Sequence, residues 1–308
     1  MKPLFKLLGV ASFVMISFSS CQKEFTMETD PINPPSGGDS IYLSKIYALT
    51  DLGSGLDTVS IMTFQFDANK RVILMSDSSV ADPDDPYIIT SKYFYNGNDT
   101  LPARFLSTWV HLDAISDYDS TKAFFTYNAA GKKTRDSILN RQSIDGDSSS
   151  QITMAMYTYA TNQMYVQSYD EQISPFSYSS AWRDTATLNA AGDIVSNKNY
   201  RRDGTPDYEL LETMSLVYDN KFSPFKYLTS FMAHFSSPYT ALEIYEHMSK
   251  ANILNETSTV QSPPSPPYTR RSVYQYNSHG LPVKSTNILL EGTPDEETYQ
   301  LIYVYKPL

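Results

Sequence analysis

Few residues of this 308-residue chain have the types and spacing that catalysis needs. A covalent mechanism needs a Ser or Cys nucleophile beside a positioned His. The chain has a single cysteine, and its four histidines are His111, His234, His247 and His279. It has no Gly-x-Ser-x-Gly elbow and no Gly-rich phosphate loop. We therefore expect a protein that is not an enzyme and has no cofactor. A glycosidase-like pair of carboxylates is the alternative, because a sequence does not give their separation.

Two groups of residues could hold a metal ion. Glu243 and His247 lie four residues apart, so on a helix they would share a face. Acidic segments at 82–86 and 145–149 offer oxygen ligands for calcium, but neither matches an EF-hand loop. A solvated helix face and ordinary acidic turns explain both patterns. The sequence therefore predicts no metal site.

The chemistry that the sequence does support is covalent modification of Cys21. Lys2 and Lys6 precede an apolar run of about a dozen residues, which is too short for a membrane-spanning helix and typical of a signal peptide. The following Phe18-Ser19-Ser20-Cys21 resembles the lipobox that the lipoprotein signal peptidase cuts. We expect residues 1–20 to be removed and Cys21 to carry the lipid that makes a membrane the protein's partner. An ordinary secretory signal with a chance cysteine is the alternative.

Residues 21–40 have the composition of a disordered tether, with Pro and Gly among polar residues. Its start, Gln22-Lys23-Glu24, resembles the short charged signals that send Bacteroidetes lipoproteins to the cell surface. A solvated linker explains it equally well, so an outer-membrane lipoprotein facing either the periplasm or the outside is expected. Without residues 1–20 the chain has 22 basic and 34 acidic side chains. That balance of −12 excludes nucleic acid as a partner.

The remaining residues, 41–308, carry an internal repeat that predicts one β domain. Each copy has an aromatic or apolar anchor in a short apolar run. Asn or Asp follows the anchor in every copy except those of Tyr159 and Tyr305, and in several copies Gly comes three residues later. The spacing is 29–32 residues except for one step of 58. The eight anchors are Phe66, Tyr95, Tyr127, Tyr159, Leu188, Tyr218, Tyr276 and Tyr305.

Each part of this motif suits a β-hairpin. An anchor and the residue two before it face the same side of a strand, and Asn or Asp followed by Gly forms a turn. Thirty residues hold two strands, so we predict an all-β, antiparallel up-and-down meander of about sixteen strands, curled or barrel-like. A transmembrane barrel is the alternative, disfavoured by the lipid anchor and by the lack of a clear outward apolar band.

The 58-residue step suggests that one copy was overwritten by an insert at about 223–267. Ser237-Pro238 is a good start for a helix, and the spacing of Leu242, Tyr245 and Met248 predicts one from about Tyr239 to Lys250. Such a helix could plug or cap one end of the curled sheet. Residues 263–267 predict a stiff extended loop.

The chain as a whole is similar to an uncharacterised family of Bacteroidetes cell-envelope lipoproteins with YD-like repeats. The similarity rests on Cys21, on the repeats, and on residues 220–225, 248–252 and 274–282. It implies a porin-like β fold and brings no catalytic residues with it.

A second candidate modification is O-glycosylation. Bacteroidetes attach glycans to exported proteins at Asp-Ser/Thr followed by a small or aliphatic residue, and six such triplets occur where about two are expected by chance. A turn that ends in Asp and enters a strand would give the same pattern. The candidate acceptors are Ser40, Thr58, Thr100, Ser120, Ser137 and Thr185.

Three functions are compatible with these sequence features. The first is a non-enzymatic envelope lipoprotein, a binding or structural module of unknown ligand. The second is a glycan-binding accessory lipoprotein of a polysaccharide uptake system, which a contiguous exposed aromatic platform would favour. The third is a carrier of an apolar ligand, which an open apolar lumen would favour.

Overall fold

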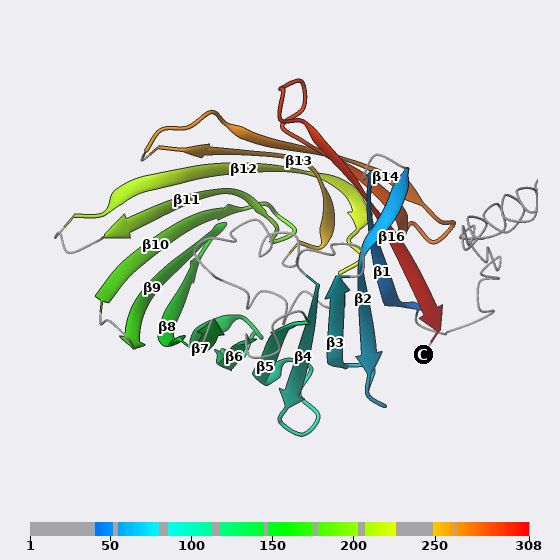
Figure 1. The fold of residues 1–308 in the computed structure, drawn as a ribbon. Helices are drawn as coiled ribbons and strands as arrows, with labels where there is room; N and C mark the ends of the chain where they lie inside the picture. The colour runs from blue at the N-terminus through cyan, green and yellow to red at the C-terminus, as the bar shows by residue number, and fades with distance from the viewer. Residues whose placement is uncertain are drawn as a thin grey trace, which may run out of the picture. The chain divides into compact units, whose positions relative to one another are not determined.

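The computed structural model describes residues 41–51, 55–79, 86–112, 118–144, 147–174, 178–202, 207–225, 249–261 and 263–307. These residues form sixteen antiparallel strands in one closed barrel, in which every strand pairs with its sequence neighbours and β16 closes onto β1 (Figure 1). The signal peptide, Cys21, the tether and Ser40 lie outside them. The predicted meander of about sixteen strands is therefore confirmed, and the sheet is closed rather than open.

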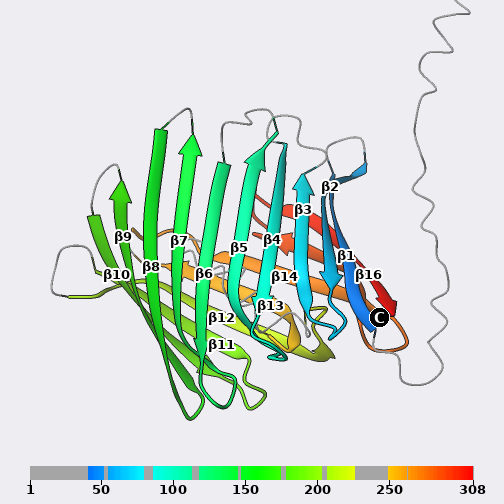
Figure 2. The ribbon, with the colours of Figure 1, turned by 90° about the horizontal axis from the view of Figure 1, so that it is seen from below.

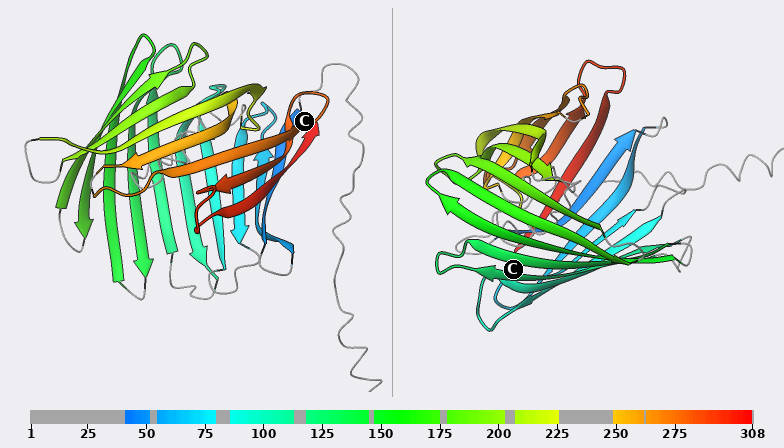
Figure 3. Two further views of the ribbon diagram at one scale, coloured as in Figure 1. Left: turned by 90° about the horizontal axis from the view of Figure 1, so that it is seen from above. Right: turned by 90° about the vertical axis from the view of Figure 1, so that its left-hand side faces the viewer.

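The strands are β1 (Ile41–Asp51), β2 (Leu56–Phe66), β3 (Val72–Ser79), β4 (Tyr87–Tyr95), β5 (Pro102–His111), β6 (Tyr118–Tyr127), β7 (Lys133–Ile144), β8 (Asp147–Ala160), β9 (Gln163–Ser174), β10 (Tyr178–Leu188), β11 (Ile194–Arg202), β12 (Glu209–Phe222), β13 (Ala251–Val260), β14 (Tyr268–Tyr276), β15 (Pro282–Leu289) and β16 (Glu297–Pro307). Strands β4 to β10 lie side by side as one wall (Figure 2). Strands β11 to β16 form the opposite wall and cross the first one steeply (Figure 3). Within the described part of the chain, no helix has the length and apolarity to cross a membrane.

Side chains alternate between the two faces of the wall, as a strand requires. In β6, for example, Ala123 and Phe125 are buried whereas Lys122 and Phe124 are exposed. The buried face lines the interior, because its side chains pack with Phe225, which follows β12, and with Tyr303 of β16. The larger of two clusters in this core comprises Leu43, Ile46, Phe64, Val72, Met75, Tyr93, Phe105, Ala123, Phe125, Ile138, Phe225, Tyr303 and Tyr305.

In four copies the Asn or Asp after the anchor organises its turn through its side chain. In the Tyr127 copy, Asn128 Oδ1 accepts hydrogen bonds from the backbone N–H groups of Ala130 and Lys132, both at 3.0 Å. Asp67, Asn189 and Asn277 accept the equivalent pair of bonds in their own turns. The Asn or Asp therefore caps the turn, and the left-handed backbone falls on the residue three positions later.

That later position explains the glycine of the repeat. Gly131 has a φ of +74°, a conformation that costs an L-residue about 1–2 kcal/mol. In the Phe66 copy the same position is Lys70, with a φ of +64°. The Phe66 copy, which lacks Gly, thus keeps the same turn at a conformational cost.

The anchors lie in strands that end at these turns, as predicted, and five tyrosines among them share one further contact. We call it the tyrosine clamp: the hydroxyl donates a hydrogen bond to the backbone carbonyl of the first residue of a neighbouring strand, 23–26 residues earlier. Each clamp therefore ties one hairpin to the hairpin before it. The five pairs are Tyr95 with Val72 at 2.7 Å, Tyr127 with Pro102 at 3.0 Å, Tyr159 with Lys133 at 3.0 Å, Tyr218 with Ile194 at 2.6 Å and Tyr305 with Pro282 at 2.7 Å.

The 58-residue step between Tyr218 and Tyr276 is not an overwritten copy, which corrects the prediction. β12 and β13 pair directly, so the step is a single hairpin with a long insertion in its turn. Asp219 Oδ1 accepts from Lys221 N–H at 2.9 Å as in the other turns. Its second donor is Asn252 N–H at 3.1 Å, 33 residues on. The turn motif is thus retained around the insertion.

The predicted insert at 223–267 was also too long, because residues 251–260 form strand β13. The predicted helix lies outside the described residues, except for Ser249 and Lys250, which are not helical. The proline-rich segment is confirmed as a loop joining β13 to β14, with one isolated bridge between Gln261 and Pro264.

Candidate functional site

The two described histidines have structural surroundings. The ring of His111 stacks on Trp109, with 5.2 Å between centroids and 21° between planes. His279 donates its backbone N–H to the turn residue Asn277. Within the described ranges, no three His, Cys, Asp or Glu side chains are placed to hold a metal ion. The candidate ligands Glu243 and His247 lie outside those ranges.

Several acidic side chains of the strands in the first wall point into the barrel, where neighbouring side chains bind them. Asp136 pairs with Lys133 at 2.7 Å and accepts the Tyr157 hydroxyl at 2.6 Å. Asp184 accepts from Asn197 and Asn199. Burial raises the pKa of Asp184, and these two amides oppose the rise.

A buried ion pair lies on the opposite wall, where Arg270 Nη2 is 3.0 Å from Glu256 Oε2. Burial and the neighbouring carboxylate of Glu212 raise the pKa of Glu256 to about 8. The Arg270 guanidinium acts in the opposite direction, because it favours the charged carboxylate. These interior charges therefore belong to the fold of the barrel.

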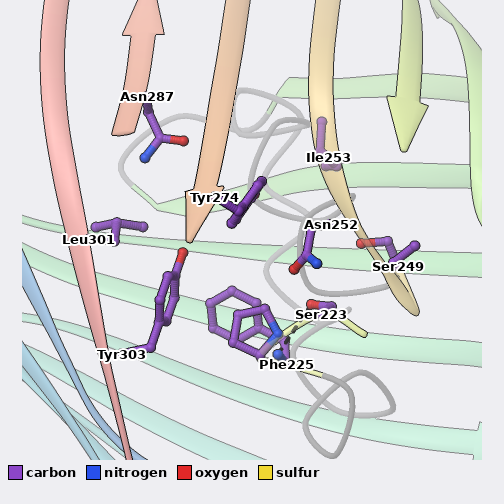
Figure 4. A pocket seen from close by; sticks show the side chains of 11 residues that line it. Ser223, Phe225, Ser249, Asn252, Ile253, Tyr274, Asn287, Leu301 and Tyr303 are labelled. Carbon is purple, nitrogen blue, oxygen red and sulfur yellow. Dashed lines mark hydrogen bonds between the residues drawn. The ribbon is translucent and has the colours of Figure 1, made fainter. Parts of the chain in front are cut away.

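One pocket is bounded by described residues near the start and end of the insertion. Figure 4 shows Tyr303 and Phe225 on one side of it and Asn252 and Ser249 on the other. Its volume of about 20 Å³ is enough for about one water molecule. This pocket gives no support to the hypothesis of an apolar-ligand carrier.

The outside of the first wall carries a different set of side chains. We call it the outer platform: the exposed apolar residues of β4, β6, β8 and β9 together with the basic residues between them. Phe124 is 48% exposed and Met156 is 50% exposed, although both lie in the middle of a continuous sheet. The platform comprises Ile88, Phe94, Phe124, Met154, Met156, Tyr165 and Tyr169 with Lys92, Arg104, Lys122, Arg135 and Arg183.

The strand register aligns these residues into rows that cross the wall. The central row contains Phe94, Arg104, Phe124, Ser137, Met154 and Tyr169, each paired with the next on the adjacent strand. At about 4.8 Å per strand, the row extends roughly 24 Å from β4 to β9. This is a linear surface that runs across the strands.

Basic side chains lie directly against the aromatic rings of the platform. The Arg104 guanidinium is 3.9 Å from the Phe94 ring centroid, and the Lys122 ammonium is 5.2 Å from that of Phe124. Near β10, Arg183 lies 4.2 Å from the Tyr208 ring. Such contacts are worth about 0.5–1 kcal/mol at exposed sites and hold the long basic side chains in place.

The candidate O-glycosylation residues are scattered over the barrel. Thr100 lies in the exposed turn before β5. The other four described acceptors lie inside strands, and Ser137 belongs to the central row of the platform. They are Thr58 in β2, Ser120 in β6, Ser137 in β7 and Thr185 in β10. The structure brings no two of them together as a site.

The sequence contains a signal for the platform in the alternation of its aromatic residues. In Tyr93-Phe94-Tyr95, alternation places Phe94 on the face opposite to the two tyrosines. The structure confirms this, since Tyr93 is buried and Phe94 is 36% exposed. The exposed Phe94 and Phe124 are thus neighbours of repeat residues, not anchors themselves.

No protein-family model and no curated protein matches the chain. The structure is similar to a porin-like protein from Bacteroides vulgatus ATCC 8482, with a TM-score of 0.50 and 11% identity, over 87% of this chain and 100% of that one. It is also similar to a porin-like protein from Bacteroides uniformis ATCC 8492, with a TM-score of 0.47 and 12% identity, over 86% and 98% of the two chains. The first likeness supports the barrel fold.

Proposed function

We propose that the protein is a non-enzymatic lipoprotein of the outer-membrane envelope that binds an extended polysaccharide along its outer platform. The observation that carries the proposal is the row of exposed apolar side chains across β4 to β9. The faces of aromatic rings stack on sugar rings, and a linear row suits a linear chain. Cys21 supplies the membrane anchor.

The same wall argues against a barrel embedded in lipid. A Lys or Arg facing lipid costs about 2–4 kcal/mol at the bilayer midplane. Lys92, Arg104, Lys122, Arg135 and Arg183 all lie on the outward face. These five residues would lie at different depths in a bilayer, and their combined cost would still reach roughly 10 kcal/mol. The apolar row is too narrow to offset this cost. The barrel is therefore better suited to water than to a membrane, although its fold is porin-like.

A binding measurement tests the proposal. We expect the full chain from residue 21, carrying Cys21→Ser to keep it soluble, to bind polysaccharides on a glycan array. The double variant Phe124→Ala/Met154→Ala removes the centre of the row, and binding to each glycan should fall at least tenfold. Val273→Ala/Val304→Ala is the matched control, since both valines are exposed on the opposite wall. Equal losses in the two variants, or no glycan bound by the parent, would refute the proposal.

A further inference from the structure

The charges of the barrel are sorted between its two faces. On the first wall, β4 to β10, the described outward side chains include several cations and a single acid, Glu171. The acids Asp136, Asp170 and Asp184 of the same wall point inward. The outward cations are Lys92, Arg104, Lys122, Arg135, Arg141 and Arg183. An acidic protein, with a net charge of −10, thus presents a basic outer wall.

These cations flank the central row on both sides. Lys92 and Lys122 lie in the row on one side, two strands apart and so about 10 Å from each other. Arg135 and Arg183 lie in the row on the other side, three strands or about 14 Å apart. Arg104 lies in the central row itself. A chain lying on the apolar row would meet basic groups along both of its edges.

These basic groups are oriented but not neutralised by the protein. Among the described residues, Lys92, Arg104, Lys122 and Arg135 form no ion pair. Arg104 and Lys122 are held over aromatic rings, and Arg135 Nη2 lies 4.0 Å from Met154 Sδ. Exposed cations held in place beside an apolar row are suited to bind the carboxylate or sulfate groups of a ligand.

From this charge complementarity we propose that the ligand of the outer platform is an anionic polysaccharide, with carboxylate or sulfate groups along its length. The proposal rests on the polysaccharide-binding function above and names its ligand class. An anionic membrane surface fits less well, because the row bends around the barrel between β4 and β10 (Figure 1). A flat bilayer touches a cylinder along its length, whereas a linear polymer can follow its circumference.

Two polymers with the same sugar backbone, one charged and one neutral, distinguish binding to charge from binding to sugar. Polygalacturonate carries a carboxylate on every residue, and its fully methyl-esterified form carries none. We expect calorimetry with the full chain from residue 21, bearing Cys21→Ser, to show binding of the charged form at least tenfold tighter than that of the ester. The same binding should weaken as salt rises from 50 to about 500 mM, because exposed charges are screened.

Variants without the basic side chains test whether the outer platform binds the charged polymer. Arg104→Gln/Lys122→Gln/Arg135→Gln should weaken binding of polygalacturonate at least tenfold and leave binding of the ester unchanged. Lys45→Gln/Lys284→Gln is the control, because both lysines lie outside β4 to β10. Circular dichroism and thermal unfolding establish that each variant is folded.

Each remaining outcome is decisive. Equal binding of the two polymers overturns the anionic ligand and leaves the polysaccharide function standing. Chondroitin sulfate tests sulfate groups, and binding of neither acidic polymer overturns this proposal. Tighter binding of a single-stranded oligonucleotide, or of vesicles with 30% phosphatidylglycerol, that is lost in the triple variant would overturn it as well. Failure of every glycan would overturn both proposals.

Discussion

Removal of the hydroxyl group from a tyrosine clamp should lower the free energy of unfolding of the barrel. Tyr127 donates its hydroxyl hydrogen to the carbonyl oxygen of Pro102, a fully buried residue, at 3.0 Å. Burial raises the pKa of the Tyr127 hydroxyl, so it stays protonated and able to donate. Tyr127→Phe keeps the ring in place and removes only this bond.

The expected loss is about 1–2 kcal/mol. A lost hydrogen bond accounts for about 1 kcal/mol, and a buried carbonyl with one partner fewer adds part of its desolvation cost. Tyr127→Ala also removes the packed ring and should cost about 3–5 kcal/mol. Successive clamps lie two strands, or about 10 Å, apart, so the effects of Tyr95→Phe, Tyr127→Phe and Tyr159→Phe should nearly add, to about 3–6 kcal/mol.

Urea unfolding followed by tryptophan fluorescence measures these losses as a shift of the midpoint at constant slope. Tyr165→Phe is the matched control, because among the described residues this exposed hydroxyl bonds only Gln163, two residues earlier. The change should alter stability by less than about 0.5 kcal/mol. If the triple variant loses no more than three times the unfolding free energy that Tyr165→Phe loses, the clamps do not stabilise the barrel.

Further predictions concern single residues. Lys70→Gly should stabilise the protein by about 0.5–1 kcal/mol, because it relieves a positive φ of 64°, whereas Gly131→Ala should destabilise it by about 1–2 kcal/mol; urea midpoints check both. In the second case the new methyl group meets only Leu101 at 3.6 Å, so a smaller loss would show that the turn conformation is not strained. Because the pKa of Glu256 is raised in the folded state, that state binds a proton that the unfolded state has lost, and stability should fall as pH rises from about 4.5 to 8. Glu256→Gln should flatten this pH dependence of thermal unfolding. An unchanged pH dependence would exclude Glu256 as its source. Cys21→Ala should abolish palmitate labelling and release the protein from membranes, and retained labelling would exclude lipidation at this residue.

The repeat made the fold predictable because each copy combines two kinds of local information. Alternating anchors define a strand with one buried face, and the following Asn or Asp with Gly defines the turn. Residues such as Asn128 and Gly131 therefore indicate a hairpin without reference to the rest of the chain. Closure is different, since the contact of Ser44 with the Val304 carbonyl joins residues 260 apart and no local pattern contains it.

The insertion and the platform were missed for related reasons. The 58-residue spacing is compatible with a lost copy or with a long turn. The pairing of β12 with β13 and the bond from Asn252 to Asp219 distinguish the two. The platform depends on which rows the register aligns, as with Phe124, Ser137 and Met154. The repeat predicts where the strands lie in the sequence. Which side chains form a row across the sheet also depends on the register between neighbouring strands.

The ladder of clamps has a consequence for how the chain folds. Each clamp connects residues 23–26 apart, so hairpins can form and lock in order as the chain emerges, with little loop entropy to overcome. The pairing of β1 with β16 is the exception, because it must wait for the last strand. Until then both edges of the sheet expose unpaired backbone groups, which is the condition under which β proteins aggregate. The slowest and most vulnerable step of assembly is therefore expected at this seam, and conditions that slow closure should favour association between incomplete barrels.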